Sequence, residues 1–158
     1  LDFAEWRRIM AVNLDGTFLA LQAALRRIDR AGGSVVVVAS ASGIKVEPET
    51  AAYGASKAAV LHLVRVAARE QAARGVRVNA IAPAGVETPM WSDQPFFRDM
   101  VSELGSEAAA YAALAAQATP LGRFASADEI AAQILFLLSD EAATITGATL
   151  TSDGGYLL

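Results

Sequence analysis

The sequence has 158 residues, which is enough for one domain with a substantial hydrophobic core. Its net charge of −4 and its pI near 5.0 argue against a nucleic-acid-binding protein, which usually carries a basic stripe. The absence of cysteine excludes disulfides and thiolate metal sites, and it fits a reducing cytoplasm. We therefore expect a cytoplasmic protein that binds neither a metal ion nor nucleic acid.

The hydrophobic content is high for a water-soluble monomer, at 54% with a mean hydropathy of +0.35. We therefore expect a partner subunit or a further part of the chain to cover some apolar surface. No apolar run approaches the ~18 residues that a membrane span needs, so no membrane partner is expected. The chain begins with Leu1 rather than Met, which we interpret as a sign that an upstream segment is absent.

Helical and strand patterns alternate along the first half of the chain. Residues 3–30 have apolar positions at helical spacing, and this predicted helix ends before Gly32. Residues 34–39 form a β-branched run without polar alternation, which predicts a strand buried on both faces of a parallel sheet. Residues 49–74 predict a second long helix that is stopped by Gly75.

The alternation continues through the second half. Residues 76–82 predict a buried strand that is broken by Pro83, and residues 92–118 have some helical character. Residues 126–139 begin with a capping pattern and predict an amphipathic helix, and residues 148–152 predict a last strand. This order predicts a Rossmann-like, doubly wound parallel sheet of the α/β class.

The helix over residues 49–74 has apolar side chains on two sides. One apolar stripe contains Tyr53, Lys57, Val60, Leu61 and Val64, and the other contains Ala52, Ala55, Ala59, Leu63 and Val66. A helix in a three-layer protein needs a second partner to cover two such stripes. We favour an oligomer interface over a short helix of the same chain.

Polar and turn-forming residues follow all three predicted strands, at Ser40 to Gly43, at residues 83–88 and at residues 153–155. Ligands of open parallel sheets bind at the carboxyl ends of the strands. Tyr53 and Lys57 lie four residues apart and therefore share one helical face. A nearby ammonium favours the phenolate form of a tyrosine, which lets it exchange a proton with a carbonyl or alcohol oxygen.

The chain resembles the short-chain dehydrogenase/reductase family over nearly its whole length. Ser40 precedes Tyr53 by 13 residues, Lys57 follows Tyr53 by 4, and Asn13 precedes Ser40 by 27, as in the catalytic tetrad of that family. The motifs that carry the resemblance lie at residues 12–18, 35–43, 53–60, 76–83, 120–124 with 129–131, and 145–147 with 153–155.

The resemblance implies a role for each member of the tetrad. Tyr53 would be the general acid/base, and Ser40 would polarise and orient the substrate oxygen. Lys57 would support the phenolate and bind the nicotinamide ribose, and Asn13 would hold a water that links Lys57 to solvent. The expected cofactor is NAD or NADP, and the expected cofactor-binding residues are Tyr53, Lys57, Pro83, Ala84, Gly85, Val86 and Thr88.

The chain departs from the family in two ways. Ala84 stands where the family has Gly, and we expect Gly85 to restore the turn. The glycine-rich phosphate turn of the amino-terminal βαβαβ half does not occur in the 158 residues. We therefore interpret residues 1–158 as one catalytic portion, roughly the last 60% of a full domain of about 250 residues. Residues 89–118 are its expected substrate-loop or lid region.

The resemblance implies an NAD(P)-dependent oxidoreductase that transfers hydride between nicotinamide and an alcohol/ketone pair, inactive as an isolated fragment. The alternatives are an epimerase or dehydratase of the family, or a non-catalytic oligomerising fragment. A homo-oligomer, dimer or tetramer, is expected.

An aromatic, apolar segment after Thr88 suits either a hydrophobic or cyclic substrate or lid packing, and Ser42 fits a structural role better than catalysis. The candidate substrate-binding residues are Ser40, Ser42, Met90, Trp91, Phe96 and Phe97. Tyr111 and Tyr156 lack a lysine at the right spacing and are interpreted as structural.

Overall fold

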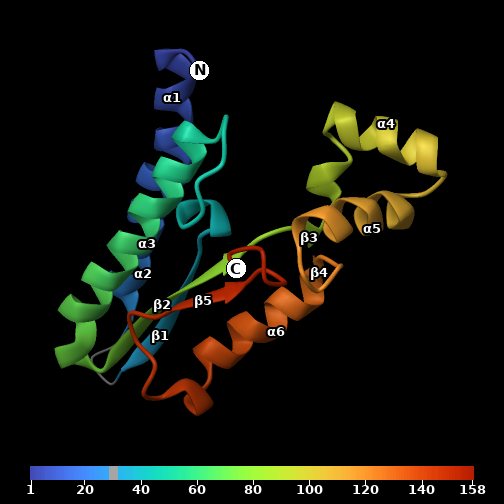
Figure 1. The fold of residues 1–158 in the computed structure, drawn as a ribbon. Coiled ribbons are helices and arrows are strands. Elements are labelled where there is room, and N and C mark those ends of the chain that lie inside the picture. The colour runs from blue at the N-terminus through green and yellow to red at the C-terminus, as the bar shows by residue number, and fades with distance from the viewer. Residues whose placement is uncertain (29–31) are drawn as a thin grey trace.

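The computed structural model of the protein describes residues 1–28 and 32–158. At its centre is a sheet of three parallel strands in the order β1-β2-β5 (Figure 1). The strands are β1 (Gly33–Val38), β2 (Val76–Pro83) and β5 (Thr149–Ser152). Parallel strands need crossover connections, and helices supply them here. The predicted α/β class with a Rossmann-like parallel sheet is confirmed.

The two long strands differ in burial. All residues of β2 except the half-buried Arg77 are buried, because β2 has a neighbour on each side. The prediction that the first strand is buried on both faces is wrong, since within the described chain β1 pairs with β2 alone and Val38 is 51% exposed. Pro83 does not break β2 but occupies its last position, opposite Ser152 of β5.

Helices cover both faces of the sheet (Figure 1). On one face α2 (Gly16–Arg27) and α3 (Ala51–Gln71) pack against the strands, and on the other face α6 (Ala127–Leu138) does so. The core between α3 and the sheet consists of small and branched aliphatic side chains. Its most deeply buried members are Val60, Val64, Val76, Val78 and Ala80.

The predicted helix over residues 3–30 is divided and shorter. α1 (Phe3–Met10) passes through a π-helical turn (Ala11–Asp15) into α2, which ends where Ile28 becomes extended. The Arg74 guanidinium donates hydrogen bonds to the backbone oxygens of Leu25 and Ile28, at 3.1 and 2.7 Å, and so satisfies the end of α2. The last two residues of the prediction lie outside the described residues.

Two local signals in the sequence are confirmed. α3 continues into a 3₁₀ turn (Ala72–Arg74) and stops at Gly75, whose φ of 69° lies in the left-handed region. α6 begins with a capping box: the Ser126 Oγ accepts from the Glu129 backbone N–H, and the Glu129 carboxylate accepts from the Ser126 backbone N–H.

Residues 89–118, which we call the lid, lie apart from the sheet (Figure 1). They contain a 3₁₀ turn (Pro89–Trp91), α4 (Pro95–Leu104) and α5 (Glu107–Ala118). A short parallel pair, β3 (Val86–Glu87) with β4 (Ala125–Ser126), flanks the lid in the chain and was not predicted. The lid is built around an aromatic cluster, which consists of its own Trp91, Phe97 and Tyr111 together with Phe124.

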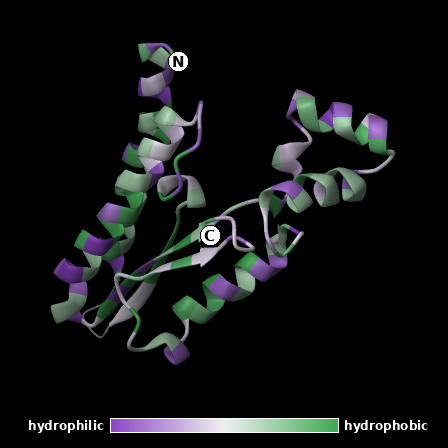
Figure 2. Cartoon of the chain, viewed as in Figure 1, coloured by the Kyte–Doolittle hydropathy of each residue, from purple (hydrophilic) through white to green (hydrophobic). Residues whose placement is uncertain are grey.

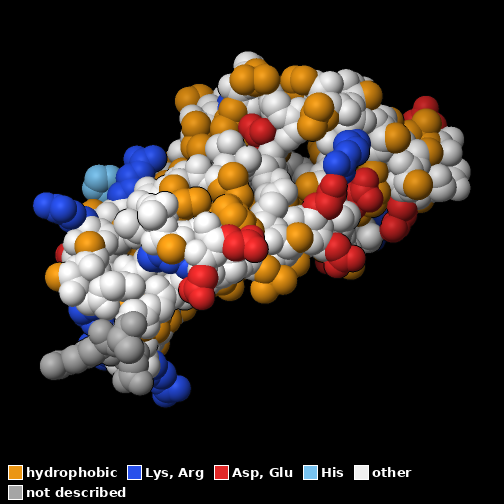
Figure 3. All heavy atoms as spheres, turned by 90° about the horizontal axis from the view of Figure 1, so that it is seen from below, with side chains coloured by type: hydrophobic (Ala, Val, Ile, Leu, Met, Phe, Trp, Pro, Cys, Tyr) orange, Lys and Arg blue, Asp and Glu red, His pale blue; other side chains and the backbone are white. Residues whose placement is uncertain are grey.

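Much apolar surface remains uncovered. Figure 2 shows hydrophobic residues along the inner strands and along much of α6, and Figure 3 shows hydrophobic side chains spread among charged ones on one face. On α6 the side chains of Leu135, Phe136 and Leu138 are 65%, 41% and 40% exposed. Among the described residues, no helix combines the length and the apolar character of a membrane span, and no group of His, Asp and Glu residues is arranged to hold a metal ion.

Candidate active site

A cavity of about 430 Å³ opens where the carboxyl ends of β1 and β2 meet the lid. Its polar side contains the hydroxyls of Ser40, Ser42 and Tyr53. The remaining wall is mainly apolar and comes from the loop after β2, from the lid, from Phe124 and from the end of the chain. None of the described residues that line the cavity is charged.

Ser40 lies two residues after the end of β1 and is buried in extended conformation. Its Oγ accepts a hydrogen bond of 3.2 Å from the Ser42 backbone N–H, which fixes the start of a short 3₁₀ turn (Ala41–Gly43). A Cβ on Gly43 would lie 2.7 Å from the backbone carbon of Lys57, so only glycine allows this turn to contact α3 so closely. The contact brings Ser40 next to the helix that carries Tyr53 and Lys57.

Tyr53 and Lys57 lie one turn apart on α3, as predicted. The Tyr53 side chain is 39% exposed and lines the cavity, and the Lys57 Nζ lies 5.7 Å from the centre of the Tyr53 ring. The Lys57 ammonium donates a long hydrogen bond of 3.4 Å to the Val38 backbone oxygen at the end of β1. Burial lowers the pKa of Lys57. The ammonium therefore lies between the end of β1 and the face of the phenol.

Asn13 is located in the π-helical turn, a feature that occurs often at functional sites. Its Nδ2 donates a hydrogen bond of 3.2 Å to the Ser56 Oγ, and this hydroxyl donates one of 2.7 Å to the Tyr53 backbone oxygen. Ser56 is fully buried beside Lys57 in the chain. The structure thus connects Asn13 to the first turns of α3, near the tyrosine and the lysine, through a residue that was not predicted.

The loop after β2 is held by the lid. Gly85 is needed for space rather than for the turn, because its φ is not positive and a Cβ would lie 2.4 Å from the Phe124 ring. The backbone oxygens of Val86 and Thr88 accept hydrogen bonds from the Trp91 Nε1 at 2.8 Å and the Tyr111 hydroxyl at 3.0 Å. Ala84 and Gly85 line the cavity, whereas Pro83, Val86 and Thr88 do not.

The four candidates from the aromatic segment fall into two groups. Met90 and Trp91 line the cavity. Phe96 and Phe97 do not line it; Phe97 is fully buried behind Trp91, and Phe96 is 48% exposed. Six further cavity residues were not among the site candidates: Ala41, Leu114, Ala118, Thr119, Phe124 and Tyr156.

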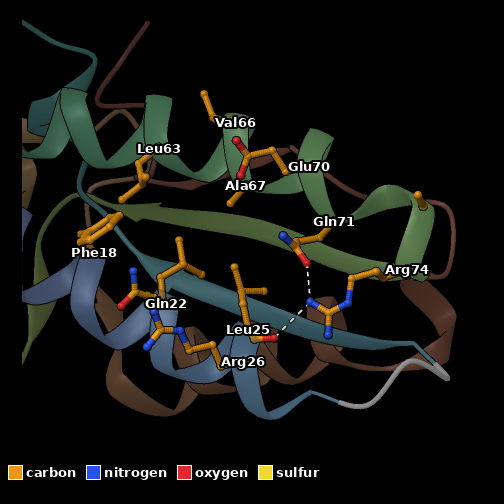
Figure 4. Close-up of a pocket in the computed structure, with 12 residues that line it drawn as sticks. Phe18, Gln22, Leu25, Arg26, Leu63, Val66, Ala67, Glu70, Gln71 and Arg74 are labelled. Atoms are coloured by element: carbon orange, nitrogen blue, oxygen red, sulfur yellow. Dashed lines mark hydrogen bonds between the residues drawn. The ribbon is translucent and has the colours of Figure 1, made fainter.

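A larger groove, of about 910 Å³, lies between α2 and α3 and contains none of the tetrad (Figure 4). Phe18, Leu63 and Val66 form its apolar part. At one end, as the dashed lines in Figure 4 show, Arg74 donates to the Gln71 side chain and to the Leu25 backbone. Leu63 and Val66 belong to the second apolar stripe that the sequence placed on this helix.

Comparisons with known proteins agree with this architecture. The family described as enoyl-(acyl carrier protein) reductase matches residues 1–157. The chain is 41% identical over 155 residues to 2-(S)-hydroxypropyl-CoM dehydrogenase 3 of Xanthobacter autotrophicus, and 40% identical over 157 residues to cis-4-hydroxycyclohexanecarboxylate dehydrogenase of Sinomonas cyclohexanicum. These alignments cover 98% and 99% of the chain but 58% of each relative, so the chain spans little more than half of their length.

Solved structures show the same relationship. The crystal structure of carveol dehydrogenase from Mycobacterium avium in complex with NAD superposes with a TM-score of 0.90 at 30% identity. The match covers 99% of this chain and 58% of the other. Aldohexose dehydrogenase of Thermoplasma acidophilum superposes with a TM-score of 0.85 at 31% identity, over 99% of this chain and 61% of the other. The chain belongs to the short-chain dehydrogenase/reductase family.

Proposed function

We propose that the chain is the carboxyl-terminal, catalytic part of an NAD(P)-dependent oxidoreductase that interconverts an alcohol and a carbonyl compound. The observation that carries the proposal is that Ser40 and Tyr53 line the same cavity, with the Lys57 ammonium 5.7 Å from the centre of the Tyr53 ring. A tyrosine and a lysine four residues apart are a common pair on helices. A serine at the end of the neighbouring strand, opening on the same cavity, is not.

The residues present fit a nicotinamide cofactor. Within the described chain, one N–H of the Lys57 ammonium goes to the Val38 oxygen, which leaves two donors for a ribose hydroxyl. Ala84 and Gly85 add little side-chain bulk to the cavity wall. The loop over residues 83–88 is held in place by hydrogen bonds from Trp91 and Tyr111 of the lid. The cofactor, when bound, supplies or accepts the hydride. The Pro83 to Thr88 loop, Tyr53 and Lys57 would hold its nicotinamide end.

The proton is moved by the chain's own groups. In reduction the Tyr53 hydroxyl gives its proton to the carbonyl oxygen, and in oxidation the phenolate takes the proton of the alcohol. Ser40 orients that oxygen by a hydrogen bond, and the Lys57 ammonium stabilises the phenolate. Asn13, connected to α3 through Ser56, would hold a water that returns the proton from Lys57 to solvent.

The cavity favours an uncharged, hydrophobic or cyclic alcohol or ketone. Met90 and Trp91 contribute apolar wall, and no cation among the described residues lines the cavity to receive a carboxylate, sulfonate or phosphate. A relative named for a hydroxycyclohexanecarboxylate supports a ring alcohol. The carboxylate in that name has no counterpart in the wall of this cavity.

We also propose that the protein is a homo-oligomer, a dimer or a tetramer, with the groove between α2 and α3 as its interface. The groove is apolar along Phe18 and Leu63, and the Val66 side chain is 41% exposed there. In sedimentation velocity, the full-length parent should run as a dimer or tetramer and Val66→Glu as a smaller species. An unchanged sedimentation coefficient for Val66→Glu would contradict this interface.

The proposed function is tested by Tyr53→Phe in the full-length protein. Without the hydroxyl, turnover should fall by about a thousandfold or more because the proton has no donor or acceptor, while NAD(P)H binding stays unchanged. Leu135→Ala, at an exposed position of α6 that does not line the cavity, is the control and should keep its turnover. Retained turnover in Tyr53→Phe would refute the assignment.

The isolated chain provides the second half of the test. We expect the isolated chain to bind NADH and NADPH weakly or not at all. Most of the contacts to the cofactor would come from a phosphate-binding turn that precedes residue 1 in the proposed full-length protein. Micromolar affinity of the isolated chain would contradict this division of the site. An epimerase or dehydratase would instead form product with no net change in cofactor absorbance.

A further inference from the structure

Tyr156 lies on the last turn of the chain and lines the active-site cavity together with Ser40 and Tyr53. It is 103 residues away from Tyr53 in the sequence, and no catalytic motif contains it. Its position beside the cavity depends on the turn that follows β5 and on two charged residues after β1.

The turn after β5 directs Tyr156 back toward the cavity. Gly154 and Gly155 have φ values of 60° and 89°, which side chains rarely adopt, and a Cβ on Gly155 would lie 2.9 Å from Pro120. The Asp153 carboxylate accepts hydrogen bonds of 3.0 Å from the backbone N–H groups of Gly155 and Leu157. The Asp-Gly-Gly sequence therefore stabilises the turn that carries Tyr156.

Two residues of the loop after β1 then fix the Tyr156 side chain. Its hydroxyl donates a hydrogen bond of 2.9 Å to the Glu47 Oε1, and the Lys45 ammonium lies 3.7 Å from the centre of its ring. The same ammonium donates to the Tyr156 backbone oxygen at 3.0 Å and lies 3.4 Å from the Glu47 carboxylate. Burial, and then the hydrogen bond to and the charge of Glu47, raise the pKa of Tyr156 to about 12. The phenol therefore stays neutral in the working pH range and keeps donating to Glu47.

The large side chains of the cavity wall differ in how firmly they are held. Met90 is 69% exposed and unbranched, so it can move aside for a substrate. Trp91 is fixed by its hydrogen bond to the Val86 oxygen and by stacking on Phe124 at 5.6 Å. Tyr156 is fixed at its hydroxyl, its ring face and its backbone. A bulky substrate can displace Met90, but it cannot displace either fixed ring without breaking these contacts.

We propose that Tyr156 is a specificity-determining residue: held in place by Lys45 and Glu47, its ring limits the size of the alcohol or ketone that reaches Ser40 and Tyr53. This proposal rests on the function proposed above and adds a residue to it. Lys45 and Glu47 are positioning residues, because they act on the substrate only through Tyr156.

The first test compares turnover of cyclohexanol and cyclooctanol by the full-length protein. Tyr156→Ala should raise the kcat/KM ratio of the larger to the smaller ring by about tenfold or more, since two methylenes gain space. Tyr156→Trp should lower the same ratio. Leu158→Ala, on the same tail but fully exposed, should leave it unchanged. A ratio within about twofold of the parent in both Tyr156 variants would overturn the proposal.

The positioning of Tyr156 by Lys45 and Glu47 is tested separately. Glu47→Gln should raise KM for cyclohexanol while kcat stays the same, and it should move the ring-size ratio in the direction of Tyr156→Ala. A fall in kcat with KM and the ratio unchanged would contradict the positioning role. Tyr53→Phe in the same assay keeps the two proposals apart, because it loses turnover of both rings if the proposed function is right.

A second test needs neither cofactor nor turnover. In a Trp6→Phe background, quenching of the remaining Trp91 fluorescence reports binding of cyclohexanone and cyclooctanone at the cavity. Tyr156→Ala should shift the preference between the two ketones toward cyclooctanone by about tenfold. An unchanged preference, or no binding of either ketone, would count against Tyr156 as the size limit.

Discussion

The core between α3 and the sheet is aliphatic and rests on paired strands, whereas the core of the lid is centred on aromatic rings. In the first, Val60 and Val64 of α3 pack with Val78 of β2, all three are fully buried, and β2 pairs on both sides. In the second, Phe97 contacts Tyr111 and Trp91 at centroid distances of 4.7 and 6.0 Å, with no three-stranded sheet beneath. The body, meaning the sheet with α2, α3 and α6, carries the proposed proton-transfer groups, and the lid contributes Met90, Trp91, Leu114 and Ala118 to the wall of the cavity. The two should therefore respond separately to substitution.

The largest expected effect comes from Phe97→Ala. Deleting a fully buried ring should cost the lid about 4 kcal/mol of its free energy of unfolding. In a Trp6→Phe background the Trp91 fluorescence should then shift to the red at denaturant concentrations at which most of the far-ultraviolet circular dichroism remains, with only the part due to α4 and α5 lost.

Phe96→Ala is the matched control, because Phe96 is 48% exposed and touches Trp91 only edge-on. It should cost about 0.5 kcal/mol. If Phe97→Ala instead lowers both signals in a single transition, the lid and the body unfold as one unit and the comparison fails.

Removing a helix cap should lower the free energy of unfolding by a smaller amount, and only in the region that contains the helix. Ser126 caps α6 of the body and Ser106 caps α5 of the lid, each accepting from a backbone N–H at 3.1 Å. Replacing either by Ala should cost about 1 kcal/mol. Ser126→Ala should lower the midpoint of the body's transition, and Ser106→Ala only that of the fluorescence transition of Trp91. Equal shifts of both midpoints by both variants would show that the regions are coupled.

The smallest effect is a dependence on pH at the start of α6. The Arg123 guanidinium, and then the Ser126 backbone N–H, lower the pKa of Glu129 from 4.5 to about 2. A carboxyl whose pKa is lower in the folded state stabilises the protein above its unfolded pKa, and this contribution is lost as the pH falls toward 2. The melting temperatures of the parent and Glu129→Gln should thus differ most at neutral pH and converge between these two values.

High salt should weaken this difference, because the Arg123–Glu129 pair is exposed. A difference in melting temperature that is the same at all pH values would show that the glutamate acts by its shape alone.

Sequence reasoning succeeded where the relevant contacts are local. The spacing of Tyr53 and Lys57 lies within one helix, and the capping box of Ser126 and Glu129 lies within one turn, so both could be predicted. Tyr156 could not, because its hydroxyl reaches Glu47 across 109 residues and its turn depends on Pro120. The burial of β1 was also overestimated, since none of its residues is fully buried. A run of valines shows that a strand forms but does not show how many neighbours the strand has.

The outer edge of β1 bears on how the protein behaves in concentrated solution. Within the described chain this edge presents unpaired backbone N–H and C=O groups along Gly33–Val38, a segment without charge or proline. Short, uncharged, β-branched segments at a free edge are templates for intermolecular sheets. Stocks of the isolated 158-residue chain should therefore lose material to β-rich aggregates in proportion to concentration, unless another strand occupies this edge.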